Sequence, residues 1–420
     1  MENDTALRIL YIHQYFRTPT MTGGTRSYEF AKRLVTSGHD VQMITADNEG
    51  LHGRRGRWTK TNEDGIDVHW LRLRYNNKLP YRRRVAAFAR FAVAAAGKAR
   101  RLGGDIVFAT STPLTVALPG AYASRTLRIP MVFEVRDLWP ELPIAMKALR
   151  RPMLVRAATW LERFAYSRSA RIVALSPGMG DGVARTGYPK DRIEIIPNSC
   201  DNDSFACSPS EGRRYLMDRA PGITNQVISY TGTLGRINGI GYLVKIAAAM
   251  QKIDASISFV IAGDGLEADQ IRAEAVEAGV LGKSLWMLGR VPKLDIPKIL
   301  AGSAAVTSLF IDLPAMWNNS ANKFFDGLAA GRPIAINYQG WQAELLERSK
   351  AGIVLPASDP EDAAARLKEF LSSKLRLEEA STAARRLAEQ QFDRDLLFER
   401  FQATILSAAK DGPTKRRRRC

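Results

Sequence analysis

Short apolar runs rich in β-branched residues recur along the chain, and each ends at a polar or glycine-containing loop. The first run, 7–13, is followed by a loop containing Gly23 and Gly24, then by a stretch with helical spacing and a second run, 41–45. This order favours a parallel, doubly wound sheet. Because ligands of such sheets lie at the carboxyl ends of the strands, Gly23 and Gly24 would allow a ligand to approach the backbone closely.

The same alternation occurs in two sets, which predicts two domains. The expected strands are 7–13, 41–45, 105–109, 131–135, 171–175 and 193–196 in the first set, and 226–230, 257–261, 284–288, 304–310, 333–337 and 352–355 in the second. A chain of 420 residues is long enough for two ordinary domains. We therefore expect an α/β protein with two Rossmann-like, doubly wound domains that face each other across a cleft.

Composition shifts give the expected boundaries. They are a first domain over 1–200, a polar linker over 201–225, a second domain over 226–390, a helix over 391–410 that packs back on the first domain, and a disordered basic tail over 411–420. Residues 48–65, rich in Gly, Arg and polar side chains, are expected to form a long mobile loop.

The positive charge of the chain is unevenly distributed. Residues 1–200 hold 32 Lys and Arg against 17 Asp and Glu, whereas residues 201–410 hold 24 against 25, and the overall net charge is +18. A one-sided excess of this kind indicates an anionic partner, either nucleic acid or a membrane surface. Zinc-finger spacing, an RNA-binding aromatic signature and a basic heptad helix are all missing from the sequence, so we favour the membrane.

The stretch from Tyr81 to Arg101 predicts an amphipathic basic helix. On a helical wheel, Arg83, Arg90, Lys98 and Arg101 share one face, and Val85, Phe88, Ala89, Ala92 and Ala96 share the other. One interpretation is a surface helix packed on its domain through the apolar face. The other is a helix at an anionic bilayer, contacted through Arg82–Arg84, Arg90, Lys98 and Arg101 and supported by the basic tail Lys415–Arg419.

Targeting and redox features are few. The start Met-Glu-Asn-Asp lacks the pattern of a signal peptide, and no apolar run approaches the roughly 20 residues of a membrane-spanning helix. Cys200, Cys207 and Cys420 have no metal-ligand spacing, which suits a reducing cytosol. Asp201-Asn202-Asp203 formally matches a divalent-cation pattern, but in a linker an Asx-turn is the commoner explanation. We expect no metal site.

The stretch 318–333 contains candidate ligand-binding residues. It follows the expected strand 304–310, and Phe324, Phe325 and Leu328 recur at helical spacing until Gly331 and Pro333. The unpaired amides of a helix start, with Ser320, Ala321, Asn322 and Lys323 nearby, form a seat for phosphate. Asp326, one turn later, is placed to accept hydrogen bonds from the paired hydroxyls of a sugar.

Two glycine clusters also follow strands of the second domain. The first holds Gly232, Thr233, Gly235, Arg236 and Asn238, and the second holds Gly263, Asp264 and Gly265. The second cluster fits the loose G-x-G-x-x-G/A pattern, so a NAD(P)-dependent oxidoreductase with a Rossmann unit at 257–290 has to be considered. That motif expects an acid after the next strand, but the strand ends at Gly289 and Arg290. A basic binding module without catalysis is a third class.

Read together, these segments resemble the retaining glycosyltransferases of family 4, which have the GT-B fold. The resemblance covers nearly the whole chain and rests on the Gly23-Gly24 loop, Pro197-Asn198, the two glycine clusters, Gly289-Arg290 and the segment 325–333. The segments 11–16 and 133–141 look like the bacterial branch that includes the N-acetyl-L-fucosamine transferases (WbuB-like) of surface polysaccharide assembly.

The resemblance implies roles for residues of the second domain. Family members carry two acids spaced E-x7-E at the donor, and here the second is Asp326 while the first position holds Asn318. Thr233 and Asn238 stand where relatives have the Arg and Lys that bind the diphosphate. By charge complementarity we nominate Arg236 and Lys323 instead. Because Asn318 is no nucleophile, a front-face substitution that retains configuration is expected, without a metal or other cofactor.

The resemblance also implies an acceptor side in the first domain. The usual His-Asp pair after the fourth strand is Arg136-Asp137 here, and in relatives that His faces the 6-hydroxyl of the donor sugar, so a 6-deoxy sugar is expected. The candidate acceptor-side residues are His13, Gly23, Gly24, Glu134, Arg136 and Trp139, with Asp137 among the catalytic residues. The implied substrates are a UDP-sugar, such as an N-acetylated hexosamine, and a polyprenyl-diphosphate-linked glycan. The implied location is the cytoplasmic face of the bacterial inner membrane, for O-antigen, capsule or exopolysaccharide assembly.

Overall fold

The computed structural model describes residues 6–21, 23–51, 56–75, 80–223 and 226–412, and the predicted contribution of Lys415–Arg419 lies outside them. The chain divides into two compact units, which are described separately. Unit 1 consists of Met1–Pro197 and Leu397–Cys420, and unit 2 of Asn198–Leu396. Both are Rossmann-like α/β domains, as the alternation of strands and helices predicts.

Unit 1 is built on an eight-stranded sheet in the order β3-β4-β2-β1-β5-β6-β7-β8, parallel except for β3. The strands are β1 (Arg8–Ile12), β2 (Asp40–Asp47), β3 (Trp58–Glu63), β4 (Ile66–Arg72), β5 (Ile106–Thr110), β6 (Met131–Val135), β7 (Arg171–Ala174) and β8 (Ile193–Ile195). The helices are α1 (Arg26–Thr36), α2 (Tyr81–Leu102), α3 (Ala117–Leu127), α4 (Glu141–Ala145), α5 (Pro152–Ser167), α6 (Pro177–Arg185) and α15 (Arg394–Asp411), with 3-10 turns at Leu114–Val116 and Lys190–Arg192.

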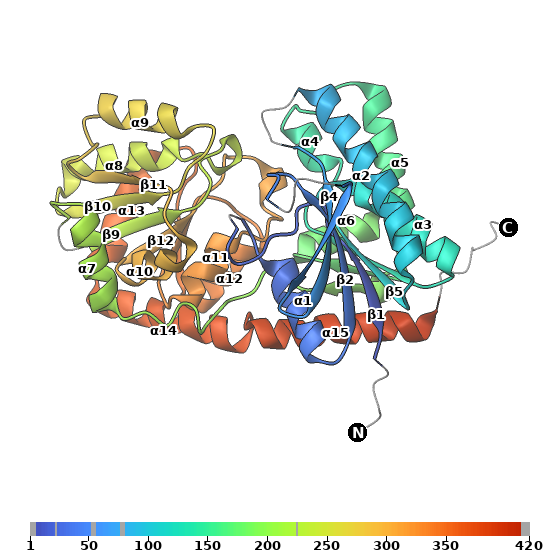
Figure 1. Cartoon of the computed structure of the whole chain (residues 1–420). Coiled ribbons are helices and arrows are strands. Elements are labelled where there is room, and N and C mark those ends of the chain that lie inside the picture. Colours follow the sequence, from blue (N-terminus) through green and yellow to red (C-terminus); the bar gives the residue numbers. More distant parts are fainter. Residues whose placement is uncertain (1–5, 22, 52–55, 76–79, 224–225, 413–420) are drawn as a thin grey trace. The chain divides into compact units, whose positions relative to one another are not determined.

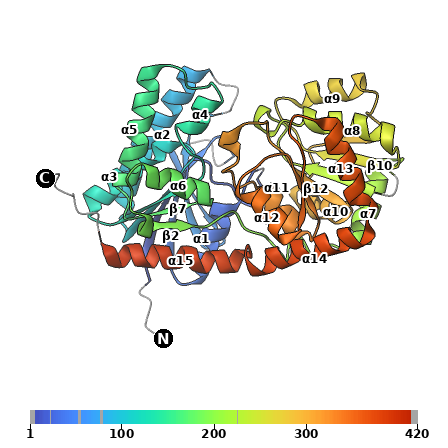
Figure 2. The same ribbon diagram turned by 180° about the vertical axis from the view of Figure 1, so that it is seen from behind.

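Both faces of this sheet are covered, so its strands are apolar on both sides. Leu10 and Ile12 point into the core under α2, α3, α5 and α6, while Ile9 and Tyr11 point into the core under α1 and α15. Figures 1 and 2 show α2, α3 and α5 side by side, and α15 beside α1. Phe401 of α15 lies 4.8 Å from Phe30 and 4.9 Å from Phe108, measured between ring centroids.

Unit 2 holds a six-stranded parallel sheet in the order β11-β10-β9-β12-β13-β14. The strands are β9 (Gln226–Thr231), β10 (Ile257–Ala262), β11 (Leu285–Gly289), β12 (Ala305–Ser308), β13 (Ile334–Ile336) and β14 (Gly352–Val354). The helices are α7 (Pro209–Arg219), α8 (Gly241–Ile253), α9 (Ala268–Glu277), α10 (Ile296–Ala301), α11 (Asn322–Ala329), α12 (Trp341–Ser349), α13 (Pro360–Ser372) and α14 (Lys374–Gln390), with 3-10 turns at Arg236–Asn238, Lys293–Asp295 and Pro314–Met316. Helices α8, α9 and α13 contribute to one core, and α7 and α10 to another (Figure 1).

The described part of the expected loop 48–65 contains a strand, so that prediction is wrong in part. Strand β3 pairs antiparallel with β4, and Glu63 opposes Ile66 across the turn Asp64-Gly65. Both turn residues have positive φ, 50° and 87°, as a two-residue hairpin turn that matches the twist of the strands requires. The polar sequence Trp58–Glu63 forms a strand because it lies at the sheet edge and buries little.

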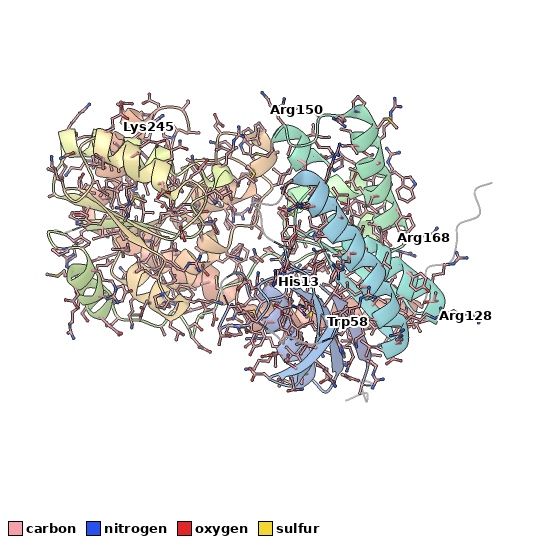
Figure 3. All side chains as sticks on the ribbon, turned by 45° about the horizontal axis from the view of Figure 1, so that its top comes forward. His13, Trp58, Arg128, Arg150, Arg168 and Lys245 are labelled. Atoms are coloured by element: carbon pink, nitrogen blue, oxygen red, sulfur yellow. The ribbon has the colours of Figure 1, made fainter. Side chains whose placement is uncertain are left out.

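The wheel predicted for 81–101 is correct for the exposed Arg83, Arg90 and Arg101 but wrong in part for the buried face. Among the side chains of α2 that the structure describes, the buried ones are Ala87, Phe91, Ala92, Ala94, Ala95 and Ala99. Val85 is 46% exposed, and Lys98 is half-buried with its Nζ 5.3 Å from the ring centroid of Trp58, a residue labelled in Figure 3. The error arises because alanines occur all round this helix and give the pattern little contrast.

The described part of the expected linker 201–225, residues 201–223, is structured, which also corrects the prediction. It contains α7, which begins after the N-cap Ser208 and packs with Tyr215 and Leu216 against Ile299 of α10. A Cβ on Gly212 would collide with the backbone of α10, so the two helices are in close contact there. The segment is therefore part of unit 2. None of the helices within the described ranges is long and apolar enough to cross a membrane.

Candidate functional site

In unit 2 the candidate site forms around the start of α11, beyond the carboxyl ends of β9, β10 and β12. Helix α11 begins at Asn322, and its N-cap residue Ala321 makes no side-chain capping bond. The first-turn amides thus lack the usual side-chain acceptor. This geometry is typical of an anion-binding site at a helix start.

Lys323 provides the positive charge of this candidate anion-binding site. Its Nζ donates to Asn238 Oδ1 at 3.2 Å and lies 5.3 Å from the ring centroid of Tyr230. Within the described residues it forms no ion pair. Burial lowers the pKa of Lys323 to about 8, and the negative charge of Asp326 opposes that shift. A lysine held by an amide and an aromatic ring keeps its charge for a ligand.

Gly232 makes room for this lysine. It has a φ of 147°, and a Cβ added there would lie 3.2 Å from Lys323 Nζ and closer still to Lys323 Cε. The first glycine cluster and the lysine of the later helix therefore belong to one site. Asn238, the partner of Lys323, ends the 3-10 turn that begins at Arg236, and Arg236 itself is exposed.

The loops after β9, β10 and β11 are hydrogen-bonded to one another. Gly232 N donates to Ala262 O at 2.9 Å, and Gly263 N donates to Gly289 O at 2.8 Å. A Cβ on Gly263 would collide with Gly232 O, and one on Gly265 with Leu234 O. These glycines serve packing between loops, which argues against their use as an open dinucleotide cradle. The side chains of Asp264 and Arg290 form an exposed ion pair at 3.5 Å.

Asp326 is half-buried one turn into α11. Burial raises the pKa of its carboxyl to about 6, and the positive charges of Lys293, Arg394 and Lys323 oppose that shift. Beneath it, Cys200 is fully buried and its Sγ lies 3.2 Å from Phe325 O. A carboxylate in this position can accept hydrogen bonds from hydroxyl groups of a ligand.

The residues before α11 are held by their neighbours. Ser320 Oγ accepts a hydrogen bond from Asn198 N at 3.0 Å, and Ser320 O accepts one from Asn198 Nδ2 at 2.6 Å. Ser320 is therefore a support for the chain at residue 198, with only its hydroxyl proton left to donate. Asn318 is half-buried, and the following Asn319 O accepts from Trp341 Nε1 at 2.8 Å.

In unit 1 the structure gives Glu134 a different position from the predicted one. It is fully buried, and its Oε1 accepts from Arg26 Nε at 2.9 Å while Oε2 accepts from Thr110 Oγ1 at 2.6 Å. Arg26 also donates to the carbonyls of Ile196 and Pro197. Because each carboxylate oxygen accepts a hydrogen bond within unit 1, Glu134 connects the ends of β5 and β6 with the start of α1.

The other first-domain candidates gather after β1 and β6. Asp137 Oδ2 accepts from Thr112 Oγ1 at 2.8 Å, and burial raises the pKa of this carboxyl. His13 is buried, its Nδ1 has no partner among the described residues, and burial with the nearby charges of Arg136 and Arg17 lowers its pKa well below the usual value. A neutral imidazole beside a cationic Arg136 can accept or donate a hydrogen bond.

The remaining acceptor-side candidates lie in loops. Gly23, with a φ of 130°, and Gly24 are exposed just before α1. Trp139 is half-buried against the core under α2, α3 and α5, so packing accounts for it.

Sequence reasoning missed Arg26, Thr110, Thr112 and Tyr230. Arg26 could have been identified from the sequence, because it is a charged residue at the start of a helix that follows two glycines.

No metal site is formed by the acidic candidates. Asp201 Oδ2 accepts from Arg394 Nη1 at 2.7 Å, which helps to lower the pKa of Asp201 although burial acts to raise it. Asn202 Nδ2 donates to Asp393 Oδ2 at 2.8 Å. Within the described ranges, no three His, Cys, Asp or Glu side chains are grouped so that they could hold a metal ion.

Comparisons with known proteins agree with this architecture. Residues 22–199 match the glycosyl transferase 4-like domain, and residues 225–373 match glycosyl transferases group 1. The chain is 24% identical over 268 residues to an alpha-maltose-1-phosphate synthase of Mycolicibacterium smegmatis, a match that covers 61% of this chain and 66% of that protein. It is 22% identical over 319 residues to the probable glycosyltransferase WbjE of Pseudomonas aeruginosa, covering 75% and 77%.

The matches span 66% of the Mycolicibacterium protein and 59% and 56% of two Streptomyces kanamyceticus proteins, an alpha-D-kanosaminyltransferase and a 2-deoxystreptamine glucosyltransferase, which is less than two thirds of their length. Among solved structures, Anabaena Alr3699/HepE in complex with UDP and glucose has a TM-score of 0.70 and 17% identity, covering 96% of this chain and 100% of that one. At that identity the likeness establishes the fold. The chain has the GT-B fold and consists of a glycosyl transferase 4-like domain followed by a glycosyl transferases group 1 domain.

Proposed function

We propose that the protein transfers a sugar from a UDP-sugar to a lipid-linked glycan, with the diphosphate seated at the start of α11. The observation that carries this proposal is the position of Lys323, a half-buried cation beside Gly232 and the uncapped amides of the helix. A solved protein of similar fold holds UDP, which supports the choice of nucleotide. Asp326 would hold the ribose hydroxyls.

The reaction we propose is a front-face substitution that retains configuration. The bond between the anomeric carbon and the diphosphate breaks, and its electron pair leaves with the phosphate oxygen. The acceptor hydroxyl attacks the same face and passes its proton to that oxygen. Asn318 stands where a double displacement would require a carboxylate. Catalysis is then mainly positioning and stabilisation of the leaving phosphate by Lys323, by Arg236 and by the helix amides.

The donor sugar we propose is an N-acetylated hexosamine without a 6-hydroxyl. Arg136 occupies the place of the histidine that faces this hydroxyl in relatives, and Asp137 and His13 lie near it in unit 1. The segments 11–16 and 133–141 support the branch of N-acetyl-L-fucosamine transferases. The oxidoreductase alternative is not favoured, since the glycines after β10 are used for loop packing.

The acceptor we propose is a polyprenyl-diphosphate-linked glycan met at the cytoplasmic face of the inner membrane, in surface polysaccharide assembly. Unit 1 provides exposed arginines on α2, including Arg82, Arg83, Arg90 and Arg101. Arg128, Arg150 and Arg168 come from the neighbouring helices and their connections (Figure 3). Helices α2 and α5 also expose apolar side chains, with Val93 73% exposed and Trp160 61% exposed. Arginine with exposed aromatic and aliphatic groups suits an anionic bilayer surface.

No metal or cofactor takes part in the proposed scheme. If EDTA abolished turnover and magnesium restored it, the scheme would be wrong and Asp201 and Asp203 would have to be reconsidered.

A thermal-shift screen of UDP, GDP, ADP and NAD, followed by a UDP-sugar panel, tests the proposal. UDP should raise the melting temperature most, because a tight ligand stabilises the folded state by mass action. Turnover should be faster with a UDP-6-deoxy-N-acetylhexosamine than with UDP-N-acetylglucosamine. Stabilisation by NAD alone would contradict the assigned site, and a clear preference for the 6-hydroxylated donor would contradict the role of Arg136.

A further inference from the structure

Unit 2 contains a cavity that none of the roles above uses. It has a volume of about 580 Å³ and lies beyond the carboxyl end of α11, between the start of α7 and one face of α14. Its walls include Cys207, Arg332, Ser381, Thr382, Arg385 and Arg386. Helix α11 separates it from the donor site, because Lys323 and Asp326 are the second and fifth residues of this eight-residue helix and Arg332 follows its end.

The charges of this cavity are mostly positive. Three arginines line it, and Glu389 is the only carboxylate among its lining residues. Within the described ranges of the chain, Arg332, Arg385 and Arg386 form no ion pair. Surface arginines without a carboxylate partner are common, but three around one cavity are a suitable arrangement for an anion.

Only some of the hydrogen-bond donors of Arg332 have an acceptor in the described part of the chain. One Nη donates to Ala301 O, while its buried Nε has no partner among the described residues. Burial lowers the pKa of Arg332, and the neighbouring charge of Arg385 acts in the same direction. A buried N–H donor without an acceptor destabilises a structure unless a ligand or water accepts from it.

Gly331 allows the side chain of Arg385 to lie close to the backbone next to Arg332. Gly331 has a φ of 61°, and a Cβ added there would lie 3.2 Å from Arg385 Nε and 3.3 Å from its Nη2. The guanidinium of Arg385 thus lies against the backbone that carries Arg332. Two guanidinium groups in this arrangement repel each other, and an anion between them would remove the repulsion and accept from both.

We propose that this cavity is a binding site for a phosphate monoester. The guanidinium groups provide paired donors that match phosphate oxygens, and the hydroxyls of Ser381 and Thr382 can add further hydrogen bonds. The volume leaves room for a small organic group beside the phosphate. The proposal does not rest on the donor assignment, because no residue is shared between the two sites.

The test measures binding of inorganic phosphate and of glucose 6-phosphate by calorimetry at constant ionic strength, with glucose and sodium chloride as controls. Arg385→Gln with Arg386→Gln should weaken phosphate binding at least about tenfold, since charge-assisted hydrogen bonds are lost. Arg272→Gln, an exposed arginine of α9, is the matched control and should bind as the wild type does. Thermal unfolding without phosphate checks that the double variant is folded.

The same binding measurement on Lys323→Ala distinguishes phosphate binding in this cavity from phosphate binding at the donor site. Phosphate binding that persists in Lys323→Ala and is lost in the double arginine variant supports the proposal, whether or not UDP binds elsewhere. Binding that is lost in Lys323→Ala and kept in the double variant places the anion at α11 and overturns the proposal. No measurable binding by the wild type, or an equal response to chloride, overturns it too.

Discussion

Lys323 Nζ donates to Asn238 Oδ1 at 3.2 Å, so a cation of α11 is held by an amide from the loop after β9. The amide fixes the position of the ammonium group without neutralising its charge. Tyr230, whose ring centroid is 5.3 Å away, adds an aromatic contact of the same kind. Two segments separated by 85 positions in the chain thus form one site, and their roles can be tested separately.

Lys323→Ala should lower kcat by about 10²-fold, because the loss of one preorganised donor to the leaving group has an effect of that order. Steady-state kinetics with a saturating donor would measure it. Lys245→Ala is the matched control, since Lys245 is an exposed lysine of α8 (Figure 3). Turnover that is unchanged in both Lys323→Ala and Arg236→Ala would refute the assigned phosphate site.

The pH profile of kcat/KM should be bell-shaped. Asp326, with a pKa of about 6, must be ionised to accept hydrogen bonds, and Lys323, with a pKa of about 8, must be protonated to bind a diphosphate. Activity should therefore fall below pH 6 and above pH 8. Lys323→Arg should move the alkaline limb to higher pH. An alkaline limb that stays in place in this variant would assign it to another group.

Asp326→Asn should stabilise the protein at neutral pH while weakening nucleotide binding. The folded-state pKa of Asp326 is raised from 3.8 to about 6, so the folded state binds more protons than the unfolded state between those values. Stability therefore falls as pH rises through this window, by at most about 3 kcal/mol. Urea unfolding at pH 4 and pH 7 would show the gain only at pH 7. An equal effect at both pH values would mean that ionisation is not its cause.

The strands that end at ligand-binding loops could be predicted because their composition differs from that of their surroundings. The predictions that failed concern segments whose composition does not show such a difference. The hairpin strand β3 is polar, and α2 has alanines on every side. The pairing of Lys323 with Asn238 and the burial of Glu134 depend on contacts distant in sequence, and a single sequence contains no signal for them. For Arg26, the sequence indicates its position at the start of a helix, but it does not indicate that Glu134 is its partner.

Arg26→Met should destabilise unit 1 by about 3–5 kcal/mol, because it leaves the Glu134 carboxylate buried without a partner. The side chains of Arg26 and Glu134 are only 4% and 1% exposed. Chemical denaturation would measure the loss, and adding Glu134→Leu should restore part of it. Arg33→Met, which removes a more exposed pair with Glu29, should cost less than about 1 kcal/mol. Equal losses in the two single variants would contradict this account.

Replacing Arg82, Arg83 and Arg84 by Gln should weaken binding to anionic liposomes. If each contributes about 1 kcal/mol near the surface, the triple variant should bind roughly 100-fold more weakly. Sedimentation with phosphatidylglycerol vesicles would measure it. The matched control replaces three exposed cations of unit 2, Lys245, Lys252 and Arg272, and gives the same net charge. Equal loss in both variants would indicate a general charge effect instead of a membrane-binding face.

The return of α15 to unit 1 has a consequence for biosynthesis. Phe30 and Phe108 are covered by Phe401, and unit 1 therefore needs residues that the ribosome adds after all of unit 2. Unit 2, by contrast, is one continuous segment, Asn198–Leu396. During translation the second domain can complete its core before the first, and an apolar face of the nascent first domain stays uncovered until α15 emerges.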